Sequence, residues 1–143
     1  MSGATLTAAD ADYVAAFEAC TIPRDLWTHR AHLRMAYCYL RLHSYDDALT
    51  RARIGIQKLN AVHKTPELID RGYHETITVA WMRILSATIR QRGAMDNSDA
   101  FFAEQAHLAQ RTLLRLFYSR ERLISWEAKK AFVEPDLLPL PAP

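Results

Sequence analysis

Glycine is scarce in this chain of 143 residues, and that scarcity limits the folds it can adopt. Average usage of roughly 7% would give about ten glycines, whereas the sequence has four. Half of the residues are hydrophobic and 24% are charged, as in ordinary globular proteins that bury a core. We therefore predict an all-α fold, a single-domain bundle of about six helices.

Capping residues and apolar residues at helical spacing mark the predicted helices. The first begins at Thr7, which has Asp10 three residues later, and ends at the break at 21–23. Ser44 separates two helices by so short a junction that they should form an antiparallel hairpin. Gly93 closes a later helix, and Ser119 caps the last. After the first, the predicted helices cover residues 23 or 28 to 43, 45–62, 73–92, 97 or 98 to 118, and 119–134.

Two segments carry proline outside this pattern. Residues 63–72 contain a proline and a glycine without clear periodicity, so we predict a loop there. Residues 135–143 hold four of the six prolines and should be extended. We therefore expect a helical domain, 1–134, and a Pro- and Leu-rich tail, 135–143, that packs on it.

Charge and composition exclude several classes of partner. The net charge is only +2, and the arginines are interspersed with acids, which predicts neither a nucleic-acid nor a membrane-surface footprint. The chain has no apolar run of the roughly eighteen residues that would cross a bilayer. Cys20 and Cys38 lack C-x-x-C spacing, and the first residues do not resemble a signal peptide. We expect a cytoplasmic protein.

The six histidines outnumber the glycines, and their angular positions around the predicted helices divide them into groups. On the helix that ends at 43, Arg30, Arg34 and Arg41 lie within about 40° of each other and should face water. His32 lies on the opposite side, and His29 lies one turn away at about 60° from it. Both imidazoles can therefore reach a common point.

A third histidine begins the helix at 73–92. His74 lies about 180° from Arg83 and Arg90 and should point into the core. Glu75 is displaced from it by about 100°, at the margin of the same buried surface.

The remaining histidines are weaker candidates. Glu104 and His107 have the Glu-x-x-His spacing of di-iron bundles, but the chain has no second copy of that motif. Helical phase places both with Arg111 and Arg115, facing solvent and opposite the apolar face. That apolar face comprises Phe102, Ala109, Leu113, Leu116 and Phe117. His63 should be an exposed loop histidine, and His43 is not assigned to either group.

Three inward imidazoles and one carboxylate are enough for a mononuclear metal site if the two helix starts meet. We predict that this site binds a transition metal ion, iron, copper or zinc, and acts on a small-molecule substrate, with redox or oxygen chemistry favoured over hydrolysis. Without a metal, His32 or His74 could act with Glu75 as a general acid–base pair. The predicted metal ligands are His29, His32, His74 and Glu75. The predicted pocket residues are Trp27, Tyr39, Tyr73 and Trp81.

Two other functions stay open at this point. Residues 36–48 resemble one tetratricopeptide hairpin, which would indicate a protein-interaction module, although such modules need about three repeats. The third alternative is a structural bundle that forms a homodimer through one face.

Three motifs carry a resemblance to known sequences. Trp27-Thr-His-Arg-Ala-His-Leu33, Gly72-Tyr-His-Glu-Thr76 and Phe132-Val-Glu-Pro-Asp-Leu137 resemble blocks in a family of short, uncharacterised bacterial proteins. The resemblance spans residues 17–140 approximately. It implies a single bacterial cytoplasmic domain and assigns no activity or cofactor.

Overall fold

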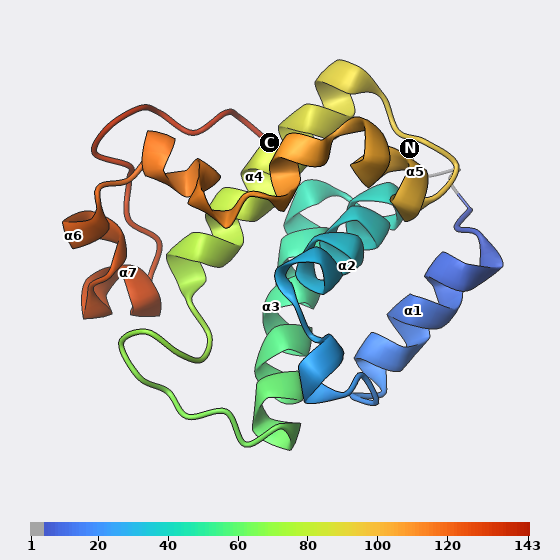
Figure 1. Ribbon diagram of the computed structural model, residues 1–143, viewed down its shortest axis with the longest axis horizontal. Helices are drawn as coiled ribbons and strands as arrows, with labels where there is room; N and C mark the ends of the chain where they lie inside the picture. The colour runs from blue at the N-terminus through green and yellow to red at the C-terminus, as the bar shows by residue number, and fades with distance from the viewer. Residues whose placement is uncertain (1–4) are drawn as a thin grey trace.

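Helix α2 lies at the centre of an all-α fold. The computed structural model describes residues 5–143. In it α2 (His29–Leu42) packs against α1 (Ala8–Glu18), α3 (Tyr45–Val62), α4 (Glu75–Arg92) and α5 (Ser98–Glu104). Figure 1 shows α2 and α3 in the middle of the molecule, with α1 on one side and the C-terminal helices on the other. The prediction of an all-α bundle is confirmed.

Most of the predicted helix starts are confirmed by their caps. The side chains of five residues each accept a hydrogen bond from the backbone N–H three residues later, which satisfies a donor that has no partner inside the helix. These residues are Thr7, Thr28, Ser44, Asn97 and Ser119. Gly93 ends α4 with a φ of 87°, a conformation that glycine adopts without strain. The α2–α3 hairpin is joined through His43 and Ser44.

The helix that we predicted to run from residue 97 or 98 to 118 is α-helical only as far as Glu104, so the prediction is wrong beyond that residue. The chain leaves α-helical geometry at Gln105 and continues as two 3₁₀ segments, Ala106–Ala109 and Arg111–Leu116. Each segment buries one leucine, Leu108 in the first and Leu114 in the second. Ala109 and Leu116, which an α-helix would bury, are exposed.

The last predicted helix is also shorter and divided. It consists of α6 (Arg120–Leu123) and α7 (Trp126–Lys130), because Ser125 interrupts it and caps α7 by accepting a bond from Ala128 N–H. Beyond α7, the backbone N–H of Leu137 donates to Phe117 O at 2.9 Å, and Asp136 accepts from Ser119. These bonds hold the C-terminal segment against the short helices.

A close approach of α1 and α3 fixes the N-terminal half of the core. Phe17 of α1 is fully buried, and its ring lies so near Gly55 of α3 that a Cβ there would overlap it. Glycine at this position therefore sets how closely the two helices pack. Within residues 5–143, no helix has the length and apolar character needed to span a membrane.

Candidate functional site at the start of helix α2

The first turn of α2 brings two histidines to one side of the helix. Thr28 caps the helix, so His29 and His32 occupy successive turns. Long side chains on a helix lean toward its N-terminus, and the His32 ring therefore lies over the turn that contains His29. The Trp27 ring stacks on His32 with ring centroids 3.8 Å apart, and Trp81 of α4 meets His29 edge-on at 4.8 Å.

Hydrogen bonds to backbone carbonyls fix the tautomer of both imidazoles. His29 Nε2 lies 3.0 Å from Leu108 O, and His32 Nδ1 lies 2.7 Å from Thr28 O. A carbonyl oxygen only accepts, so each of these nitrogens carries the proton. In the neutral rings, His29 Nδ1 and His32 Nε2 therefore present lone pairs.

Both rings are held in the neutral state. Burial lowers the pKa of His32 to about 4, with smaller contributions from the nearby His29 and Arg111, against the opposing effect of the bond to Thr28. Burial and Arg111 also lower the pKa of His29, although its bond to Leu108 opposes this. In residues 5–143, Tyr45 Oη is the one fully enclosed side-chain nitrogen or oxygen atom without a partner, so neither free histidine nitrogen is completely enclosed.

His74 does not join this pair. The sequence predicted a helix from residue 73, but α4 begins at Glu75, and His74 is its N-cap. Its Nδ1 accepts from Ile77 N–H at 3.1 Å, and its Nε2 donates to Leu123 O at 3.0 Å. Nδ1 thus caps α4 and Nε2 holds α4 to α6, so neither nitrogen is free to bind a metal or transfer a proton.

Glu75 faces a different neighbour. Its carboxylate accepts two hydrogen bonds from Arg53 of α3, at 3.0 and 2.7 Å, and a third from Tyr73 Oη at 2.5 Å. Burial raises its pKa, but the bonds from Arg53 and Tyr73 outweigh burial, and the net pKa is lowered. Glu75 therefore stays ionised and joins α3 to α4, so the predicted acid–base pair with His74 is not formed.

The predicted set of four ligands is divided by these contacts. His29 and His32 share one helix turn, whereas His74 contacts α6 and Glu75 contacts α3. Residues 5–143 contain no group of three or more His, Cys, Asp or Glu side chains placed to hold a metal ion. The two helix starts that the sequence prediction relied on do not meet at a common centre.

The predicted pocket residues are divided in the same way. Trp27 and Trp81 flank the two histidines. Tyr73 belongs to the Glu75 contact, and Tyr39 is buried, with its hydroxyl donating to Glu18 at 2.6 Å.

The other histidines have structural positions. His63 caps the end of α3, and its Nε2 donates to Ile22 O at 2.8 Å, so it is not the free loop side chain that we expected. His43 ends α2, with its ring 5.9 Å from that of Tyr39. Glu104 and His107 are exposed, as the phase argument predicted.

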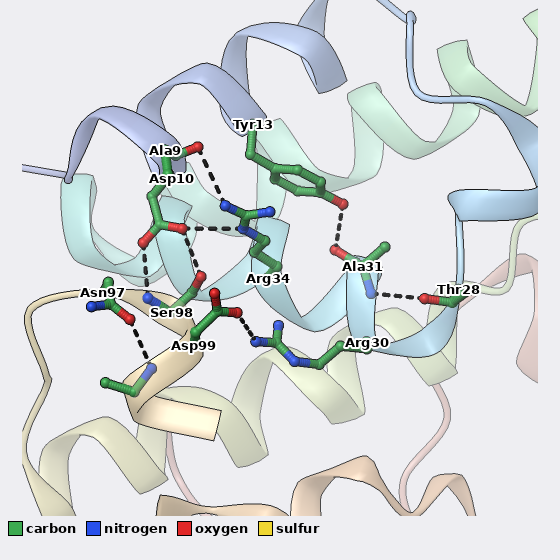
Figure 2. Close-up of polar contacts among 11 residues, drawn as sticks. Ala9, Asp10, Tyr13, Thr28, Arg30, Ala31, Arg34, Asn97, Ser98 and Asp99 are labelled. Atoms are coloured by element: carbon green, nitrogen blue, oxygen red, sulfur yellow. Dashed lines mark hydrogen bonds and ion pairs between the residues drawn. The ribbon is translucent and has the colours of Figure 1, made fainter. Parts of the chain in front are cut away.

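A cleft of about 460 Å³ opens on the other side of the same helix start, between α1 and α2. Figure 2 shows the polar residues around it. The Arg34 guanidinium stacks on the Tyr13 ring at 4.4 Å, and its Nε donates to Asp10 at 3.1 Å. Asp10 is almost fully buried and also accepts from the N–H and hydroxyl of Ser98, at 2.8 and 2.6 Å.

The second arginine of the cleft is more loosely held. Arg30 donates to Asp99 of α5 at 2.9 Å, and the Asp99 side chain is 86% exposed. The guanidinium of Arg30 also lies 4.3 Å from the centroid of the Phe102 ring. The prediction that Arg30 and Arg34 simply face water is wrong, because α1 and α5 cover that side of α2. Arg30 and Arg34 are four residues apart in the sequence, and that spacing could have indicated the cleft. From the sequence we interpreted it as a helix face exposed to water.

The residues of the three resemblance motifs make contacts that stabilise the fold. In the second motif, Gly72 has a φ of 91°, and Thr76 accepts from Val133 N–H and donates to Ala131 O. In the third, the Phe132 ring lies 5.6 Å from Arg83. In the first motif, His29 and His32 each keep one ring nitrogen beyond the one that is bonded to a backbone carbonyl.

No protein-family model, curated protein or solved structure matches this chain. Function must therefore be argued from the site itself.

Proposed function

We propose that the chain binds a transition metal ion through Nδ1 of His29 and Nε2 of His32, and that water or a small-molecule substrate fills the remaining coordination positions. One observation carries the proposal: each imidazole donates one N–H to a backbone carbonyl and keeps the other nitrogen free. Histidines that bind metals almost always show this arrangement, because the second bond fixes the tautomer and orients the ring.

The electrostatics of the pair support the same function. A metal competes with protons for an imidazole, so a histidine with a lowered pKa stays available to the metal at acid pH. The His32 pKa of about 4 means that its ring is neutral throughout the physiological range. Imidazole nitrogen suits zinc, copper and iron, the ions that the sequence predicted.

Two protein ligands leave several coordination positions open. Open positions allow a bound ion to polarise a substrate or activate water. We expect Trp27 and Trp81 to form the apolar walls beside them, since their rings flank the two histidines. Redox or oxygen chemistry stays a prediction, because two imidazoles serve redox and hydrolytic metals alike.

Titration of the untagged, metal-free protein with Zn²⁺ and Cu²⁺ tests this proposal. Calorimetry should show one site, and Cu²⁺ should quench the fluorescence of the adjacent tryptophans. We expect His29→Ala and His32→Ala each to weaken binding at least about tenfold, since each removes a ligand. His43→Ala is the matched control, because His43 lies at the opposite end of α2 from the proposed site.

Two further measurements make the test decisive. His32→Gln keeps a planar polar side chain beside Trp27 and should still lose binding, while circular dichroism checks that it folds. Binding should persist at pH 5.5, where an ordinary histidine of pKa near 6.5 is about 90% protonated. Unchanged affinity in both alanine variants, or equal loss in His43→Ala, would overturn the proposal.

The interaction-module alternative has narrower support. Residues 36–48 resemble one tetratricopeptide hairpin in sequence, but the helices that follow in the described chain differ in length and do not repeat the α2–α3 hairpin. Concave repeat surfaces need about three units, so that function stays a prediction.

A further inference from the structure

The cleft between α1 and α2 has an apolar wall and a charged rim. Its volume of about 460 Å³ lies within the range of small-molecule sites. The apolar wall comes from both helices and from the segment that joins them. It includes Tyr13, Ala16, Ile22, Leu26 and Ala31. Leu26 is 60% exposed at this wall, which leaves apolar surface for a ligand to cover.

The charged side chains that line the cleft are Arg30, Arg34 and Asp99. Each arginine has a carboxylate partner, Asp99 for Arg30 and Asp10 for Arg34, but the two pairs differ in how firmly they are held. Arg34 is fixed in place by Asp10, by the Tyr13 ring and by its bond to Ala9 O at 3.3 Å (Figure 2). Asp10 therefore balances the charge of Arg34, which leaves Arg30 as the arginine that can bind an anion.

Arg30 is the group that can receive a ligand. Its partner Asp99 is exposed, and exposed ion pairs of this kind contribute little to stability. A ligand carboxylate can therefore replace Asp99 at small cost, and a guanidinium binds a carboxylate through two parallel hydrogen bonds. The Phe102 ring beneath the Arg30 guanidinium limits its motion and holds it ready for this contact.

We infer that this cleft binds a small monocarboxylic acid with an aliphatic body, its carboxylate on Arg30 and its aliphatic chain against Ile22, Leu26 and Tyr13. The inference is separate from the proposed metal site, because neither His29 nor His32 lines the cleft.

Calorimetric titration with octanoate below its micelle concentration tests this inference, with 1-octanol and octylamine as probes of the same chain length. Octanoate should bind at one site, and the two probes should bind at least about tenfold more weakly, since a charged hydrogen-bonded pair is worth that factor. Arg30→Gln should weaken octanoate binding by a similar factor, and Leu26→Ser should weaken it too. Asp99→Asn should strengthen it, because the competing carboxylate is removed.

Arg115→Gln is the matched control, since Arg115 is exposed and lies outside the cleft. Circular dichroism of each variant establishes that it is folded. Equal binding of octanoate and 1-octanol, or weaker binding by Asp99→Asn, would overturn the inference. His29→Ala should leave octanoate binding unchanged, because His29 does not line the cleft. The metal site and the carboxylate site can therefore be tested separately, and failure of one proposal would leave the other standing.

Discussion

At the scale of single residues, hydrogen-bond partners rather than residue type separate the histidines. His32 and His74 are both half-buried, and burial lowers the pKa of both. His32 keeps a free nitrogen because its other nitrogen donates to a carbonyl at the start of its own helix. In His74, by contrast, both ring nitrogens are already hydrogen-bonded. Only His32 can bind a ligand without breaking the fold.

The His32 pKa predicts a loss of stability in acid. The unfolded side chain takes up a proton near its ordinary pKa of 6.5, whereas the folded one does so near 4. Between these values the unfolded state binds more protons, so the free energy of unfolding falls as the pH drops from 6.5 to 4 and rises again with pH. Urea unfolding across this range should show the slope, and His32→Gln should reduce it. Titration of the His32 ring near pH 6.5 by NMR would contradict the prediction.

Asp10 also loses its contribution in acid, but at lower pH than His32. Burial raises its pKa, but hydrogen bonds from Ser98 and Arg34 outweigh burial and lower the net value below 3.8. Its contribution is therefore present above pH 3.8 and lost as the pH falls further. Asp10→Asn should lower the free energy of unfolding by about 2 kcal/mol, because it weakens charged hydrogen bonds to buried donors. The exposed Asp12→Asn should change it by less than about 0.5 kcal/mol in the same urea experiment; equal losses would contradict this account.

At the scale of elements, side-chain caps were the most predictable feature. A cap is a local interaction between residues three apart, so the sequence alone indicates it at Thr7, Ser44 and Ser119. The 3₁₀ segments after Gln105 were not predictable in this way. Their geometry follows from the burial of Leu108 and Leu114 against distant parts of the chain, which overrides α-helical spacing.

The two functions of His74 can be separated by substitution. Asparagine is a good N-cap but cannot reach Leu123, so His74→Asn should cost about 1 kcal/mol, the worth of one hydrogen bond. His74→Ala removes the cap as well and should cost about 2 kcal/mol. Thermal or urea unfolding should give this order, and neither variant should change metal binding. An alanine variant as stable as the asparagine variant would argue against the capping function.

At the scale of the whole molecule, long-range hydrogen bonds attach the C-terminal segment and the residue 63–74 connection to the bundle. Lys129 of α7 is 5% exposed and donates to Arg71 O at 2.6 Å and to Tyr73 O at 2.8 Å. Its Nζ also lies 3.1 Å from Glu67. One side chain thus holds α7 and the longest connection together.

Replacement of this lysine should loosen the connection. Lys129→Met leaves two carbonyls and a carboxylate without their donor, and we expect a loss of about 2–3 kcal/mol. Limited proteolysis should then cleave within residues 63–74 before the helices unfold. Lys130→Met is the control, since Lys130 is exposed. Equal resistance of both variants to the protease would contradict this prediction.

The sequence by itself determined the all-α class, most helix starts and the placement of His29 and His32 on one helix turn, because these depend on neighbours a few residues apart. The tertiary structure decided which histidines keep a free nitrogen, that Glu75 pairs with Arg53, and that Arg30 and Arg34 line a cleft. Apart from the bond of His32 to Thr28 in its own helix, these outcomes depend on groups far along the chain, such as Leu108, 79 residues from His29, and Glu75, 22 residues from Arg53. Local periodicity places a side chain around its own helix, but only packing determines which partner it meets.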